Sequence, residues 1–204
     1  MIIFGTRTTN PKTGAGVFNC PRCGPQRQFT HRKAKRWFTL YFIPVIPLGT
    51  AGEFIECDAC GESFGTEVLS YDPAAERAEM VDRMRRLSVL AMIFAGRYQP
   101  DNVAALRAAL QAMTNEFVHE EAVHQDVQLA QQAQAQLEPV FQSQTQDFSA
   151  DGKTALLQLI LSTLAPTRQV QAQDHQIVHR AAAAMAVPAD IAEAQIRTYM
   201  GSPA

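Results

Sequence analysis

The sequence predicts an α+β protein of two segregated parts, a small β-rich module followed by an all-helical region. All four cysteines lie near the start of the chain, between Cys20 and Cys60. The most apolar run, RWFTLYFIPVIPLG at residues 36–49, lies between them and is rich in the aromatic and β-branched residues that strands favour. From Asp72 onward apolar residues recur at three- and four-residue steps, which is typical of helices. We therefore expect domains at residues 1–70 and 71–204.

Composition and charge support this division. The 204 residues are 47% apolar, enough for a hydrophobic core. The net charge of −2 gives no overall attraction to nucleic acid or anionic lipid, but it is unevenly spread. Residues 1–70 carry +3 and residues 71–204 carry −5, and such a step suggests two modules.

The apolar run is too short to cross a membrane. It extends only from Trp37 to Leu48, whereas a helical span needs about 20 residues. Pro44 and Pro47 would also break a helix there. The start, MIIFGTRTTN, lacks the basic and long apolar regions of a signal peptide. We expect a cytoplasmic protein without a transmembrane segment.

The cysteines form two CxxC pairs, each followed by glycine. CPRCG supplies Cys20 and Cys23, CDACG supplies Cys57 and Cys60, and the segment 24–56 separates the pairs. Two residues between thiols allow both sulfurs to face inward from one tight turn, and glycine accepts the left-handed backbone that such a turn often needs. The four thiolates predict one structural zinc ion, with no open position for catalysis.

Other uses of the four cysteines are weaker. Two disulfides disagree with a reducing compartment. A thioredoxin-like pair would need a βαβ pattern, which the sequence lacks. Mononuclear iron or an iron–sulfur cluster uses the same ligands and stays open as an alternative.

The apolar run has two interpretations. A module of about 70 residues needs a metal or another staple, and its apolar residues should gather around it. RWFTLYF is then a strand and FIPVIP an edge strand where proline is tolerated. We expect a core made of Trp37, Leu40, Phe42, Ile43, Val45 and Ile46. The alternative is a partner-binding surface made of Trp37, Phe42, Ile43, Pro44, Val45, Ile46 and Pro47.

The first part also resembles a known family. FGTR, the two CxxC-Gly pairs and RWFTLYFIPVIPLG are similar to zinc-ribbon proteins with a "wFtlFFIPviP" signature between their knuckles. The resemblance spans about residues 2–67. It implies a β-rich ribbon with one zinc ion and no agreed activity.

A basic stretch within this module raises a nucleic-acid alternative. Its phosphate contacts would come from Arg27, Arg32, Lys33, Lys35 and Arg36, together with His31, with Phe29 and Trp37 for base stacking. Four thiolates and one Zn²⁺ together add −2, so the module falls from +3 to about +1 once metallated. That balance favours a solvated hairpin over a basic domain.

The second part begins with a strong helix signal. Asp72 is the expected N-cap, Pro73 the first helical residue and Gly96 the stop. The expected buried face contains Met80, Met84, Leu87, Ala91 and Phe94. A second helix follows with Val103, Leu106, Leu110 and Met113 on one side. The pattern returns in the last third of the chain, where Leu106 corresponds to Val178 and Met113 to Met185. This recurrence predicts two related helical hairpins joined by connecting helices.

This duplicated unit resembles the TerB-like domain linked to tellurite resistance, over about residues 80–201. Members carry "aDGxvxxxE" after the first helix of each repeat, and its acidic residues bind metal. Ala95 and Thr167 stand at the aspartate positions, and Asn102 and Asp174 at the glutamate positions. Only Asp174 is acidic, so the resemblance implies the fold and argues against that metal site.

Histidines in the helical region give no catalytic motif. HQIVH places His175 and His179 one turn apart, as in HExxH, but Gln176 replaces the catalytic glutamate and cannot act as a base. We therefore interpret the pair as a solvated helix face. His119 and His124 do not share a face. The sequence also lacks a phosphate-binding loop and a nucleophile elbow.

These observations predict a non-enzymatic interaction or adaptor protein with one structural zinc ion and a protein partner. Nucleic-acid binding through the basic stretch is the first alternative. A metal-dependent enzyme or metal sensor in the helical region is the second.

Overall fold

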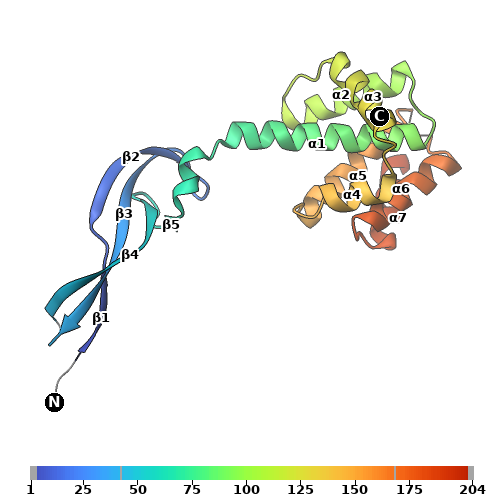
Figure 1. Ribbon diagram of the computed structural model, residues 1–204. Helices are drawn as coiled ribbons and strands as arrows, with labels where there is room; N and C mark the ends of the chain where they lie inside the picture. Colours follow the sequence, from blue (N-terminus) through green and yellow to red (C-terminus); the bar gives the residue numbers. More distant parts are fainter. Residues whose placement is uncertain (1–3, 42, 168, 202–204) are drawn as a thin grey trace. The chain divides into compact units, whose positions relative to one another are not determined.

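A computed structural model describes residues 4–41, 43–167 and 169–201. The chain forms two compact units, Met1–Arg77 and Ala78–Ala204, called here the sheet unit and the helical unit. The fold class is the expected one, an antiparallel sheet followed by helices (Figure 1).

Strand β3 organises the sheet unit. The strands are β1 (Phe4–Thr9), β2 (Lys12–Cys20), β3 (Gly24–Leu40), β4 (Ile43–Cys57) and β5 (Ser63–Phe64), followed by the 3₁₀ helix η1 (Thr66–Ser70). On one side of β3, β2 pairs with its first half and β1 with its second half. On the other side β4 pairs along its length, and all pairings are antiparallel.

The core of the sheet unit is small and lies beside the cysteines. Phe18, Ile55 and Val68 are buried together with Cys20 and Cys57. The ring of Phe18 packs edge-on against two other phenylalanine rings. With so few buried residues, this unit depends on a staple at its cysteines.

The first part of strand β4, which contains the end of the apolar run, pairs irregularly with β3. Its pairing with β3 skips Val45, Leu48 and Ala51, which are three bulges in one strand. Within the described residues, β5 meets β4 only at Ile55 and Glu56, so the segment 43–54 is a sheet edge. Prolines are tolerated there because an edge strand need not donate on its outer side.

The expected core made from the apolar run was wrong. Leu40, Ile43, Val45 and Ile46 are 38%, 63%, 51% and 54% exposed. Trp37 is half-buried, its indole N–H donating to Thr9 Oγ1 at 3.0 Å. Phe42 lies outside the described residues. The reason is topological, because the core forms at the cysteine end of the sheet and the apolar run lies at the opposite end of β3.

The helical unit has one continuous core. The helices of the described residues are α1 (Pro73–Phe94), α2 (Pro100–Thr114), α3 (Glu120–Gln132), α4 (Leu137–Gln144), α5 (Ala150–Leu164), α6 (Ala172–Ala184) and α7 (Ala189–Gly201). Helix α5, whose Leu156, Leu157 and Ile160 are fully buried, packs against α2, α6 and α7.

The start and end of α1 are as predicted. Asp72 Oδ1 accepts a hydrogen bond from the Ala74 N–H at 2.9 Å, and Gly96 has a φ of 64°. Met84, Leu87 and Ala91 are buried. The prediction for the second helix was wrong at its end, where Met113 is 46% exposed.

The two helical hairpins use equivalent polar residues. Asn102 and Asp174 occupy the third position of α2 and α6 and are both buried. Asn102 donates to the Thr163 and Leu164 carbonyls at 2.7 and 3.2 Å, at the end of α5. Asp174 binds Arg97, in the loop after α1. Asn102 therefore holds the end of α5, and Asp174 holds the loop after α1.

Candidate metal centre

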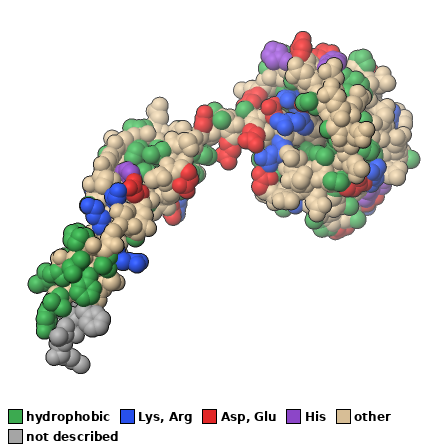
Figure 2. All heavy atoms as spheres, viewed as in Figure 1, with side chains coloured by type: hydrophobic (Ala, Val, Ile, Leu, Met, Phe, Trp, Pro, Cys, Tyr) green, Lys and Arg blue, Asp and Glu red, His purple; other side chains and the backbone are tan. Residues whose placement is uncertain are grey.

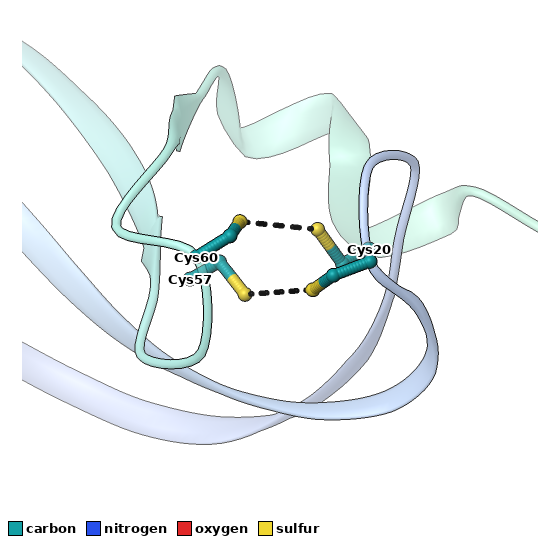
Figure 3. A group of neighbouring side chains, drawn as sticks. Cys20, Cys57 and Cys60 are labelled. Carbon is teal, nitrogen blue, oxygen red and sulfur yellow. Dashed lines mark hydrogen bonds between the residues drawn. The ribbon is translucent and has the colours of Figure 1, made fainter.

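Two loops bring the four cysteines together. The first pair lies at the turn between β2 and β3, and the second follows β4 (Figure 3). Gly24 and Gly61, directly after each pair, have φ values of 96° and 72°. The expectation of a left-handed glycine in each turn is confirmed, because only glycine adopts such φ values at little cost.

The sulfurs are spaced for one tetrahedral ion. Cys20 Sγ and Cys60 Sγ are 3.8 Å apart, and Cys23 Sγ and Cys57 Sγ are 3.6 Å apart. All four sulfurs lie within 4.8 Å of one another. Zinc–sulfur bonds of about 2.3 Å in a tetrahedron place sulfurs roughly 3.8 Å apart. The four free cysteines therefore fit one structural zinc ion and are too far apart to be disulfides.

The protonation of the thiols suits metal capture. Burial opposes ionisation of Cys57, but the backbone N–H groups of Cys60 and Ala59 outweigh it and lower the pKa of this thiol to about 7. Burial, with hydrogen bonds to the neighbouring thiols, raises the pKa of Cys23 to about 12. An arriving cation thus meets one thiol, Cys57, that ionises near neutral pH, and it displaces the proton of Cys23.

Neighbouring residues hold the two turns in place. Arg27 donates two hydrogen bonds, of 3.0 and 2.9 Å, to the Cys23 carbonyl. Arg22 forms an ion pair with Glu62, which joins the two turns. Thr30 on β3 donates to Asp58 at 3.0 Å. Arg27, considered above for phosphate contacts, therefore supports the metal site.

Residues 18–91 match the model of a zinc-ribbon family. The match covers both cysteine pairs and both long strands and extends into α1. Comparisons with curated proteins and with solved structures found no match. The sheet unit is a zinc ribbon, and its four cysteines hold one structural zinc ion.

The basic residues of the ribbon divide into two groups. Arg32 forms an ion pair with Glu56, and Lys33 Nζ lies 2.7 Å from Glu53 Oε1. Lys35 and Arg36 are both exposed, and no carboxylate among the described residues forms an ion pair with either. The four side chains considered for nucleic-acid binding do not form one continuous cationic surface.

The apolar residues considered for partner binding gather at one end of the sheet. Pro44 and Pro47 are exposed together with Ile43, Val45 and Ile46. Sequence analysis missed their exposed neighbours Leu40, Tyr41 and Leu48 as members of this surface. Figure 2 shows hydrophobic side chains clustered over this part of the sheet unit.

Among the described residues, no helix combines the length and the apolar character that crossing a membrane requires.

Proposed function

We propose that the chain is a non-enzymatic interaction protein whose zinc ribbon presents an apolar surface to a protein partner. This surface, called here the apolar hairpin end, consists of Leu40, Tyr41, Ile43, Val45, Ile46 and Leu48. Its exposure is the observation that carries the proposal. The six side chains are 38–63% exposed, at the turn of the β3–β4 hairpin and in the first residues of β4.

Clustering distinguishes this surface from ordinary surface hydrophobics. Single exposed apolar residues are normal, whereas contiguous ones mark interaction sites. These six lie within the segment 40–48, and Pro44 and Pro47 between them are exposed as well. Zinc fixes the opposite end of the same two strands, so the hairpin is held in shape without burying these side chains.

The shape of β4 indicates how the partner binds. A sheet edge can recruit another strand through its backbone, but Pro44 and Pro47 lack N–H groups and three bulges interrupt this edge. Backbone pairing is therefore disfavoured, and the side chains are the available contact. A partner with an apolar groove that receives the hairpin end suits this arrangement.

Nucleic acid and membrane surfaces receive less support. Arg32 and Lys33 are paired with carboxylates, which leaves Lys35 and Arg36 beside the apolar hairpin end. These two cations would contribute only about 2 kcal/mol of attraction to an anionic membrane leaflet, which gives a membrane contact little support. The helical unit's resemblance to TerB-like domains, and with it tellurite resistance, stays a prediction, as does an enzyme in that unit.

Site-specific photo-crosslinking in cells tests the proposal. A benzophenone amino acid replaces Ile46 in the full chain, and a control chain carries it at Leu129 of α3, which is also exposed at 60%. We expect one protein to cross-link reproducibly from position 46 and not from position 129. A second substitution, Ile43→Asp, should abolish that product while the ribbon cysteines keep their zinc ion.

Three outcomes would reject the proposal. Cross-links from position 46 only to a second copy of this chain would show self-association. Co-sedimentation with anionic vesicles, lost on Ile43→Asp, would show a membrane contact. Identical products from positions 46 and 129 would show that the apolar hairpin end has no specific partner.

A further inference from the structure

We propose that the helical unit holds a second metal site, formed by His175, His179 and Glu193, for a divalent transition-metal ion such as Zn²⁺. The three side chains come from two helices. His175 and His179 lie one turn apart on α6, and Glu193 lies on α7. The helices pack together and are joined only by the short segment 185–188, so the three positions are held in register.

The donor atoms already converge. Nε2 of His175 and Nε2 of His179 lie 3.0 and 2.9 Å from the same oxygen of Glu193, Oε1. The two imidazole rings are 4.6 Å apart between centroids, and all three donors lie within 4.8 Å of one another. Ligands bound to one ion at about 2.0–2.2 Å are separated by roughly 3.0–3.5 Å. Small side-chain adjustments suffice for an ion to enter.

The donor set selects the class of ion. Two imidazoles and one carboxylate suit Zn²⁺, Co²⁺, Ni²⁺ or Cu²⁺, whereas Mg²⁺ and Ca²⁺ prefer sites built of oxygen. The chemistry differs from that of the four-thiolate site. The two sites should therefore accept metal independently.

The site is open to solvent. The side chains of His175, His179 and Glu193 are 41%, 29% and 39% exposed. Three protein ligands leave at least one coordination position for water, so the ion exchanges more readily than one enclosed by four cysteines. Gln176, the neighbour that would be the base in an HExxH motif, is exposed and has no basic group. The inference is of reversible metal binding, not hydrolysis.

The sequence was interpreted as placing the histidine pair on a solvated face, and in the structure both partly exposed side chains also contact Glu193. The spacing of His175 and His179 was visible in the sequence, and the third ligand was not. Glu193 belongs to the next helix and reaches His179 only because α7 folds back along α6. A bound ion would join the two helices and stabilise the helical unit by mass action.

The test titrates Zn²⁺ into the full chain, already carrying its ribbon zinc, in competition with a chromophoric chelator. We expect a second ion per chain in the native protein. His175→Gln combined with His179→Gln should weaken it by at least about 100-fold, because losing a residue that only supports a ligand already costs ~10–100-fold. His119→Gln is the matched control, since His119 is exposed at the start of α3 and should leave the second ion in place.

A second readout identifies the ligands. Co²⁺ added to the zinc-loaded protein should show ligand-field bands without thiolate charge transfer, and Glu193→Gln should alter them while circular dichroism stays native. The inference is overturned if the native chain takes up only one ion at a several-fold excess of zinc. It is also overturned if the double-histidine variant binds the second ion equally well, or if the added Co²⁺ shows thiolate ligation.

Discussion

The guanidinium of Arg97 donates two hydrogen bonds to the carboxylate of Asp174, each 2.9 Å long, and that carboxylate is fully buried. Asp174 Oδ2 also accepts the Gln171 N–H at 2.9 Å, at the start of α6. One buried anion thus connects the loop after α1 to the first turn of α6. In the sequence, Asp174 is the one acidic residue at the metal-binding positions of the TerB-like pattern. In the structure it forms a buried ion pair with Arg97.

Replacing Arg97 and replacing Asp174 should lower the free energy of unfolding by different amounts. Asp174 is fully buried, whereas the Arg97 side chain is 26% exposed. Arg97→Gln leaves a buried carboxylate without its cation and should lower the free energy of unfolding by about 3–5 kcal/mol. Asp174→Asn leaves a cation that water can reach and should cost less, about 2 kcal/mol. Urea unfolding followed by circular dichroism measures both.

The control for this pair is Arg86→Gln. Arg86 is 54% exposed and lies 3.9 Å from Asp82, so its loss should change stability by less than about 0.5 kcal/mol. Equal losses for Arg97→Gln and Asp174→Asn would show that burial does not determine the cost.

Gly61→Ala should weaken zinc binding through the backbone alone. Gly61 has a φ of 72°, and nothing lies within 4 Å of an added Cβ. The strain of a left-handed alanine is about 1–2 kcal/mol, or roughly tenfold in affinity. Gly52→Ala is the control, because Gly52 has the same open space without a positive φ. Competition with a chelator measures the affinities, and equal values in the two variants would contradict the argument.

Cys57→Ser should remove the ribbon zinc and unfold the sheet unit. Metal binding and folding are coupled in small modules, and the sheet core contains two of the ligands. Most helical circular dichroism should persist, since the helical unit has a core of its own. Native mass spectrometry reports the metal, with Val17→Thr, at a 64% exposed strand position, as the control. Collapse of the helical signal would show that the helical unit depends on the ribbon.

We expect the stability that the Arg83–Asp147 ion pair contributes to be lost in acid. The hydrogen bond from Arg83, at 2.7 Å, lowers the pKa of Asp147 from 3.8. A lowered folded-state pKa contributes stability above the unfolded value, and that contribution is lost as the pH falls through the folded value. The Asp147 side chain is 61% exposed, so Asp147→Asn should cost little at neutral pH, within the range of ordinary surface substitutions.

Measuring the unfolding free energies of the native protein and of Asp147→Asn across pH checks the sign of this effect. Their difference in unfolding free energy should be constant from neutral pH down to about pH 5 and shrink to zero below 3.8. A difference that grows toward acid would mean that the carboxylate of Asp147 is not stabilised by Arg83.

Local signals in the sequence were sufficient for the metal centre and for α1. The two ligands of each CxxC turn are close neighbours in the chain, and Asp72 caps a helix that begins at the next residue. Contacts between distant residues were not predictable in the same way. The position of the apolar hairpin end depends on which end of β3 holds the core, and Glu193 meets His179 only after two helices fold together.

The bulged strand also bears on how this chain can change over generations. Leu40 lies midway between Cys23 and Cys57, so the hairpin end is the middle of a segment whose two ends carry the zinc ligands. Because its exposed residues contribute nothing to the core, substitutions there escape the usual conflict between new contacts and folding. Side chains at the hairpin end can thus be exchanged for others while the core and the cysteine cluster stay intact.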